Sequence, residues 1–506
     1  MSTQKNQTSE AKYYDYFNTN HLKSNLKQRS VRGGVVTITA QASKFILKFG
    51  STAVLARLLV PEDYGLIGMA TVVVGFVEYF KDLGLSAATI QRAEINHKQV
   101  STLFWINLGV SCLVALIVAL LAPAIANFYH EPRLKKITLG LAINFIFGGL
   151  TVQHQALLRR QMQFTSLAKI EVVSMTLGVF TAIIAAYSGL RYWALVLMLI
   201  AIAISNAIGV WLACGWRPGL PSRNSGVLKM LAFGGNLTGF NLVNYFSRNL
   251  DNVLIGRRWG SQELGLYAQA YKLVLLPIQQ INNPISSVAL PTLASLQSQP
   301  EKYCRFYYQA MLSISTLGMP IIGFLFASAN DVILLLLGEQ WLETVPIFKL
   351  LMPAAFNATI GVGMGWAYQS LGNVGRQFRW GIVSSMLNAV LFFIGVRWGA
   401  IGVAAVFGLS RPFFLLAGFT YCFAQTPLKL TKLISTLSMP TLASIGAAII
   451  LSYIKLVLPI EINTLMIVLI DLGFYTLLYL LIWILLPNGR KTLWEMVQLS
   501  KVLRQR

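Results

Sequence analysis

Residues 34–70 read GVVTITAQASKFILKFGSTAVLARLLVPEDYGLIGMA, and residues 234–270 read GGNLTGFNLVNYFSRNLDNVLIGRRWGSQELGLYAQA. At this offset five residues are identical, and the polar residues share one register: Gln41, Lys44 and Lys48 align with Asn241, Asn244 and Arg248. Positions i, i+3 and i+7 lie on one face of a helix. Each copy is therefore predicted to be an apolar helix with a polar, cationic stripe, followed by a second apolar helix. Such repeats are typical of membrane transporters.

The composition indicates a membrane protein. Hydrophobic residues make up 55% and charged residues only 12% of the 506 residues, against roughly 25% charged residues in ordinary soluble domains. Apolar runs of about 18 residues or more, the length needed to cross the hydrocarbon core, recur along the whole chain. We therefore predict an all-α polytopic membrane protein with fourteen transmembrane helices.

The net charge of +23 is distributed as in a membrane protein. Lys and Arg gather in both tails and in alternate short connections, as at Arg159, Arg160 and Lys169. The positive-inside rule then predicts that both termini are cytoplasmic. Because Lys and Arg lie mostly in alternate short loops, as the positive-inside rule places them, no nucleic acid is expected as a partner.

The fourteen spans are predicted to form two similar halves of six spans each, followed by two accessory spans. The polar stretch GWRPGLPSRNSGVLK separates the halves, and the last two spans lie outside the repeat. The predicted segments are a cytoplasmic N-terminal tail at 1–33, a six-helix bundle at 34–214, a cytoplasmic linker at 215–229, a second six-helix bundle at 230–424, two accessory transmembrane helices at 438–486, and a cytoplasmic C-terminal tail at 487–506.

Five basic residues lie deep within predicted spans: Lys44, Lys48, Arg248, Lys272 and Arg411. The first three lie ten to fifteen residues into their helices, roughly 15–22 Å at 1.5 Å per residue. A charge at the bilayer centre costs ~2.5–3.5 kcal/mol, so it usually faces a cavity or a partner. We predict that these five residues line a water-filled cavity, with structural pairing as the alternative.

Acidic and polar residues accompany these cations. The supporting polar stripe consists of Gln41, Asn241, Asn244 and Asp251, and Asp251 lies three residues after Arg248, at ion-pair spacing. Glu171 lies about one turn inside the end of its span, so its side chain is expected to reach the membrane surface. The cysteines and histidines lack metal-ligand spacing, and no nucleotide-binding or hydrolase motif occurs. We therefore predict no catalytic residue, no metal and no cofactor.

Four stretches of this sequence resemble the bacterial polysaccharide flippases of the multidrug/oligosaccharidyl-lipid/polysaccharide exporter superfamily. The similarity is strongest to the lipopolysaccharide and colanic-acid exporter branch. The stretches are LARLLVPEDYGLIGMA at 55–70, DLGLSAATIQR at 82–92, LRRQMQFTSLAKIE at 158–171 and LDNVLIGRRWGSQELGLYAQAYKL at 250–273.

The resemblance implies two six-helix bundles related by a parallel repeat around a central cavity, plus two accessory helices. It implies a substrate of undecaprenyl diphosphate carrying an oligosaccharide, flipped to the outer leaflet of the bacterial inner membrane. The expected partners are the lipid bilayer and the polymerase and glycosyltransferases of the same pathway. In such flippases basic cavity residues receive the anionic head group, which implies this role for Lys44, Lys48 and Arg248, and for Lys272 and Arg411.

Three alternatives remain at this point. A peptidoglycan lipid-precursor flippase of the same fold would also need a cationic cavity. A cation-coupled multidrug exporter generally uses a membrane-embedded acid, whereas the deep charges here are mostly basic. A membrane oligosaccharide polymerase generally needs a substantial external loop, and the longest external connection, at 330–343, is largely apolar.

Overall fold

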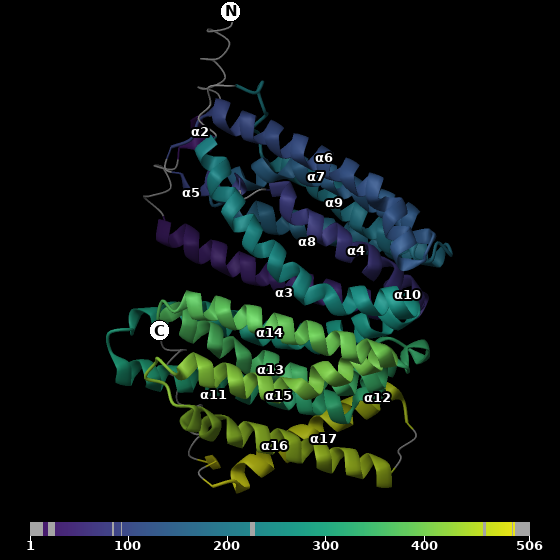
Figure 1. The fold of residues 1–506 in the computed structure, drawn as a ribbon, viewed down its shortest axis with the longest axis vertical. Coiled ribbons are helices and arrows are strands. Elements are labelled where there is room, and N and C mark those ends of the chain that lie inside the picture. Colours follow the sequence, from purple (N-terminus) through teal and green to yellow (C-terminus); the bar gives the residue numbers. More distant parts are fainter. Residues whose placement is uncertain are drawn as a thin grey trace, which may run out of the picture. The chain divides into compact units, whose positions relative to one another are not determined.

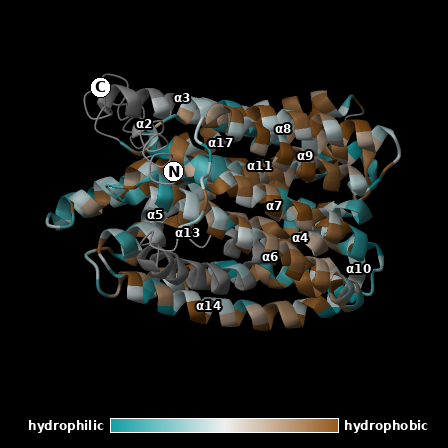
Figure 2. Ribbon diagram, turned by 90° about the horizontal axis from the view of Figure 1, so that it is seen from above, coloured by the Kyte–Doolittle hydropathy of each residue, from teal (hydrophilic) through white to brown (hydrophobic). Residues whose placement is uncertain are grey.

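The computed structural model describes residues 14–18, 26–82, 85–92, 94–222, 228–458, 462–487 and 489–490. All regular structure within these ranges is helical, which confirms the predicted all-α class. The chain packs as two compact units that divide after Gly265. Hydrophobic residues run along the helices, and hydrophilic residues gather at helix ends and connections (Figure 2).

The first unit contains helices α2 to α9 and the start of α10. In it, α6, α7, α8 and α9 lie side by side (Figure 1), and α3 packs along α8. The bounds are α2 (Tyr14–Phe17), α3 (Leu26–Leu58), α4 (Pro61–Asp82), α5 (Leu85–Gln91), α6 (His97–Tyr129), α7 (Arg133–Arg160), α8 (Phe164–Tyr187), α9 (Trp193–Ala213) and α10 (Leu228–Ser295).

The second unit contains the rest of α10 and helices α11 to α17. Here α13 packs on α15, and α11 packs on α16 (Figure 1). The bounds are α11 (Pro300–Ala327), α12 (Ala329–Leu336), α13 (Thr344–Ser370), α14 (Val374–Gly395), α15 (Gly399–Phe423), α16 (Leu430–Val457) and α17 (Thr464–Leu485).

Helix boundaries follow local signals in the sequence. Pro61 is the first residue of α4, where its missing N–H costs nothing. At the start of α6, the side chain of Asn96 accepts from the N–H of Gln99 and the Gln99 side chain accepts from the N–H of Asn96. This reciprocal capping box satisfies two backbone donors and fixes where the helix begins.

The 68-residue helix α10 consists of two helical segments joined at Gly260. Gly260 has φ 84° and ψ −172°, a backbone conformation that only glycine adopts readily. Two of the fourteen spans predicted from the sequence are at about 230–255 and about 264–291, and the break lies between them. The two packing units therefore divide just after this break, while the predicted division at the linker 215–229 stays a prediction.

Nine helical segments within the described ranges are long and apolar enough to cross a membrane, and one of them, Val374–Phe423, contains both α14 and α15. Four predicted spans lie outside this set and coincide with α3, α4 and the two segments of α10. The multi-pass character is thus clear, and the number of fourteen crossings stays a prediction.

Two glycines at equivalent positions of the repeat make reciprocal contacts. A Cβ built on Gly65 would overlap the carbonyl group of Ser261, and a Cβ built on Gly265 would overlap the carbonyl group of Pro61. Residues 261 and 265 are the repeat equivalents of residues 61 and 65. Each segment therefore contacts the other through equivalent residues. Such a self-complementary contact is the mark of local two-fold symmetry.

Ion pairs tie together the connections beside this crossing in the first unit. Arg133 donates to Glu62 at 2.6 Å and to Glu131 at 2.7 Å, and Arg191 donates to Glu62 at 3.1 Å. The hydrogen bond from Arg133 lowers the pKa of Glu131, in the connection between α6 and α7. The start of α4 is thereby bound to two neighbouring connections, α6–α7 and α8–α9.

The opposite end of the first unit is held by one buried arginine. The guanidinium of Arg160, the last residue of α7, donates to the carbonyl of Phe17 in α2, at 3.2 and 3.3 Å, and to the carbonyls of Thr89 and Arg92, at 3.1 and 2.5 Å. Sequence analysis placed Arg160 in a short connection between two predicted spans. The structure adds that its side chain is buried and links α2, α5 and α7.

The beginning of the predicted linker packs against this end of the unit. Trp216 is fully buried and donates its indole N–H to Nδ1 of His97. The backbone N–H of Gly219 donates to Ser101, and Trp105 donates to the carbonyl of Gly219. Residues 215–222 are therefore bound along the first turns of α6 as part of the first unit.

A second group of ion pairs holds the accessory helices. Lys455, near the end of α16, pairs with Asp331 of α12 and, at 2.6 Å, with Asp471 of α17. Ser328 also donates to Asp471, at 2.8 Å. Sequence analysis left Asp471 without a role, and these contacts give it a structural one.

The glycine crossing predicts a position-specific effect of one methyl group. Gly65→Ala and Gly265→Ala should each destabilise the protein by about 1–3 kcal/mol, because the added Cβ overlaps a backbone carbonyl that cannot turn away. The measurement is the apparent melting temperature of purified protein in detergent, which should fall by several degrees.

Gly50→Ala is the matched control, because a Cβ on this helical glycine of α3 meets nothing within 4 Å. It should leave the melting temperature unchanged or raise it slightly. Equal behaviour of all three variants would contradict the close approach.

Candidate functional site

Lys44 and Glu171 form an ion pair between α3 and α8. Lys44 Nζ lies 2.5 Å from Glu171 Oε2, and the two side chains are 24% and 39% exposed. Glu171 was expected to reach the membrane surface on its own. Instead, its carboxylate binds a lysine that sequence analysis had assigned to the substrate.

Lys48 lies one turn further along α3 and is in a different situation. Its side chain is exposed, as is that of Gln41 on the same stripe. No carboxylate in the described part of the chain lies within ion-pair distance of Lys48. Exposing a cation and an amide to hydrocarbon would cost free energy. We therefore expect this face of α3 to contact water or a polar ligand.

The second copy of the stripe is described only in part. Asn241, Asn244 and Arg248 belong to the first segment of α10, but their side chains lie outside the described residues. Asp251 is 4% exposed, and its carboxylate accepts from the N–H of Asn252 at 2.8 Å. The predicted role of Arg248 beside Lys48 in binding an anion therefore stays a prediction.

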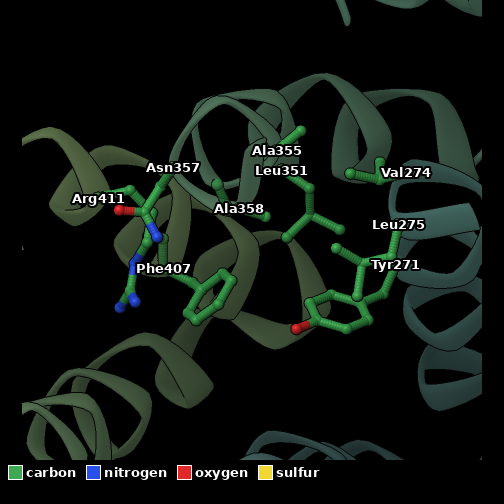
Figure 3. Close-up of a pocket in the computed structure, with 10 residues that line it drawn as sticks. Tyr271, Val274, Leu275, Leu351, Ala355, Asn357, Ala358, Phe407 and Arg411 are labelled. Atoms are coloured by element: carbon green, nitrogen blue, oxygen red, sulfur yellow. The ribbon is translucent and has the colours of Figure 1, made fainter. Parts of the chain in front are cut away.

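Arg411 lies beside a pocket of about 150 Å³ in the second unit. Figure 3 shows Arg411 and Asn357 on one side of this pocket and Tyr271 on the other, with the ring of Phe407 between them. The lining residues come from α10, α13 and α15, and those not yet named are Val274, Leu275, Leu351, Ala354, Ala355 and Ala358. A mostly apolar cavity with a few convergent polar groups is typical of ligand sites.

Arg411 is 7% exposed, and its guanidinium is bound mostly by neighbouring groups. Nε donates to the Phe407 carbonyl at 3.0 Å, and Nη2 donates to the side chains of Asn388 and Ser410. The charge also lies over the rings of Phe407 and Phe414, at 4.1 and 4.5 Å. Most polar atoms of this side chain are therefore engaged in structural contacts, as the alternative to a ligand-binding role expects. Nη1 has no hydrogen-bond partner among the described groups.

The remaining predicted cation, Lys272, is half-buried and follows Tyr271 in α10. Three polar residues of this region were missed: Tyr271 and Asn357 in the pocket wall, and Asn388 bound to Arg411. Asparagines 357 and 388 stand alone in apolar runs, and this could have marked them as partners of a buried charge. Within the described residues, no three His, Cys, Asp or Glu side chains come together as metal ligands.

The described cations therefore differ in what they can bind. Lys48 is exposed, Lys44 is partly exposed but paired with the carboxylate of Glu171, and Arg411 is buried. Lysine acts as a mobile point charge, whereas an enclosed arginine holds fixed geometry. The arrangement can attract an anion most directly at the α3 stripe.

Comparisons with known proteins agree on a family of polysaccharide biosynthesis proteins. Residues 54–346 match the family described as "Polysaccharide biosynthesis protein". Lipopolysaccharide biosynthesis protein WzxC of Escherichia coli (strain K12) is 26% identical over 393 residues, 76% of this chain and 79% of that protein. Succinoglycan biosynthesis transport protein ExoT of Rhizobium meliloti (strain 1021) is 26% identical over 317 residues, 62% of this chain and 64% of that protein.

Among solved structures, the lipid II flippase MurJ in an inward closed conformation has the same fold. The TM-score is 0.70 at 15% sequence identity, and the match covers 89% of this chain and 98% of that one. At this level of identity the likeness concerns the fold alone.

The contacts of Arg411 predict a coupled effect on stability. Asn388→Ala should lower the apparent melting temperature, because an acceptor of a buried charge is lost, at a cost of about 1–3 kcal/mol. The double variant Asn388→Leu with Arg411→Met should recover most of the loss, since an apolar pair leaves no charge unsatisfied. If Asn388→Ala melts like the unchanged protein, Asn388 does not support Arg411.

Proposed function

We propose, since this chain belongs to the polysaccharide biosynthesis protein family, that it is a flippase for lipid-linked oligosaccharides. The observation that carries this proposal is the family match over residues 54–346 in a chain with the MurJ fold. The substrate is an undecaprenyl-diphosphate-linked repeat unit, moved from the cytoplasmic to the outer leaflet of the bacterial inner membrane. Glycosyltransferases and a polymerase act before and after this step.

The architecture in this proposal is a parallel repeat of two six-helix bundles, 34–214 and 230–424, with two accessory helices. The reciprocal contacts of Gly65 and Gly265 support it. So does the likeness of the turns that follow α7 and α13, which contain Met162 with φ 52° and Gly372 with φ 72°. Fourteen crossings then leave both termini in the cytoplasm.

Lys44, Lys48 and Arg248 are the proposed ligands of the substrate's diphosphate, with Gln41, Asn241, Asn244 and Asp251 completing the polar stripes. A diphosphate cannot cross hydrocarbon as a bare anion, because desolvating an unpaired charge costs many kcal/mol. Cations in a wet cavity supply compensating attraction. Arginine can bind phosphate with two parallel hydrogen bonds, and lysine acts as a point charge.

Lys272 and Arg411 are proposed to act on the substrate in a secondary way. Arg411 is enclosed by Asn388 and Phe407, so it contributes mainly a positive potential beside its pocket. Lys272 lies next to the pocket residue Tyr271 in the sequence. A few spread cations hold the substrate weakly enough to release it on the far side.

The peptidoglycan-precursor alternative shares both the fold and the need for cations. The family match favours a polysaccharide substrate, because WzxC and ExoT are named for polysaccharide pathways and MurJ is related here by fold alone. Restored export of a polysaccharide in a strain that lacks its own flippase is the direct test of function. Rescue of a strain depleted of its lipid II flippase instead would favour the alternative.

Charge reversal on the two stripes should abolish transport. The double variant Lys48→Glu with Arg248→Glu should lose export of the polysaccharide by at least about tenfold, because the introduced carboxylates carry the same negative charge as the diphosphate and repel it. The charge-keeping pair Lys48→Arg with Arg248→Lys should retain part of it. Export is measured in the complemented strain, with protein levels in the membrane matched by immunoblot.

Normal export by the double glutamate variant at matched levels would show that these residues do not carry the substrate. Loss of the protein from the membrane would instead identify a folding defect, and the charge-keeping pair separates the two cases.

The two ends of α7 should face opposite sides of the membrane. Lys135 and Arg159 are exposed at its first and last turns, whereas Arg160 is buried and unsuited to labelling. In a variant without the native cysteines, Lys135→Cys should react with an impermeant thiol reagent on intact cells and Arg159→Cys should not. Both should react after the cells are opened, and the reverse pattern on intact cells would invert the topology.

A further inference from the structure

We propose that Glu171 is the resting counter-ion of Lys44 and competes with the substrate's diphosphate for it. This inference rests on the proposed function, because it concerns the same anion on the same stripe. Glu171 is then a positioning residue, which acts on the substrate through Lys44. Sequence analysis had assigned it no such role.

The first support is the contrast between two lysines of one stripe. Lys44 is held by Glu171 at 2.5 Å, whereas Lys48, one turn away on α3, is exposed and binds no described carboxylate. Side chains four positions apart on a helix are neighbours. An anion that arrives at Lys48 is therefore within reach of Lys44, provided that Lys44 leaves Glu171.

The second support is that the pair is open on one side. Glu171 is 39% exposed and Lys44 is 24% exposed, so neither charge is sealed among apolar side chains. Ion pairs that remain open to solvent contribute little net stability, and exchanging one partner for another costs correspondingly little. The long, flexible stem of lysine lets its ammonium swing between two acceptors without moving the helix.

The third support is that another lysine ion pair of this chain is built differently. Lys455 lies between Asp331 and Asp471, Asp471 is buried, and Ser328 completes the cluster. Lys455 is therefore shared by two carboxylates, one of them buried, whereas Lys44 has a single carboxylate that is 39% exposed. A single exposed carboxylate is exchanged for a competing anion more easily than two carboxylates are.

The consequence is that Glu171, a residue of the protein itself, limits the affinity of the site for the diphosphate. When the diphosphate takes Lys44, the displaced carboxylate of Glu171 stays nearby and repels it. Before the substrate arrives, the pair neutralises a cation that would otherwise be costly at this depth. After the substrate leaves, Glu171 recovers Lys44 and opposes rebinding.

The test is the dissociation constant of undecaprenyl diphosphate, without sugar, for purified protein in lipid nanodiscs. Glu171→Gln should bind about two- to fivefold more tightly, the range implied by a pair that is open to solvent, and should export polysaccharide more slowly in cells. A merely structural ion pair would not tighten binding when broken. Glu171→Asp should behave like the unchanged protein, because it keeps the carboxylate.

Two further variants identify the cause. Lys44→Gln combined with Glu171→Gln should lose the gain in affinity, since the gain depends on the released lysine. Asp331→Asn is the matched control, because it removes one carboxylate from Lys455 far along the chain, and it should leave binding unchanged.

Unchanged or weaker binding by Glu171→Gln would overturn the inference and leave the proposed function intact. If the unchanged protein does not bind undecaprenyl diphosphate, then the proposed substrate class fails as well. Tighter binding that persists in the double variant would assign the effect to the loss of Glu171 alone and refute competition for Lys44.

Discussion

A charge cannot stay in hydrocarbon without water or a partner, and this constraint accounts for where the polar side chains of the chain lie. Each described cation within or beside the helices meets it in its own way. Arg160 binds backbone carbonyls, Arg411 binds an asparagine and aromatic rings, and Lys455 lies between two aspartates. Arg160 and Arg411 are buried, Lys455 is shared by two carboxylates, and all three hold helices together. Lys44 has a single carboxylate partner, and Lys48 is exposed without one among the described residues, which is the difference expected between structural cations and those that meet a ligand.

The glycine crossing complements these polar contacts because it sets how closely two helix starts can approach. At Gly65 and Gly265 a backbone carbonyl occupies the space that a side chain would need, so packing is dense without a polar contact. The ion pairs of Arg133 and Arg191 lie beside the crossing, on connections that water can reach. Close packing on the helices and charge on their connections together hold the start of α4.

Much of the fold could be predicted from the sequence, because apolar runs and their breaks are local signals. The break at Gly260 lies in the polar run between two predicted spans, and the capping box at Asn96 marks the start of α6. The partners of the buried charges could not be predicted. Lys44 and Glu171 are 127 positions apart, and Arg160 meets the carbonyl of Phe17 at a separation of 143. Such contacts depend on how helices pack, and a single sequence contains no local signal for that. Each buried charge indicated that a partner exists, but not which residue it is.

The partners of the cations in the candidate site could not be predicted from the sequence either. Their different exposure and partners suggest why a flippase would use cations that bind an anion to different degrees. Sequence depth ranks Lys44, Lys48 and Arg411 alike, yet they differ in exposure and in partners. An enclosed arginine keeps its charge fixed, so it shapes the potential of a cavity without binding tightly. A lysine shared with a carboxylate can change partners, and an exposed lysine is free to make the first contact with an anion. Transport needs binding that is easily reversed, since every kcal/mol of extra affinity slows release. In the proposed mechanism, partial neutralisation of Lys44 by Glu171 is the source of this weakness, and the exposed Lys48 supplies the positive charge that admits the anion.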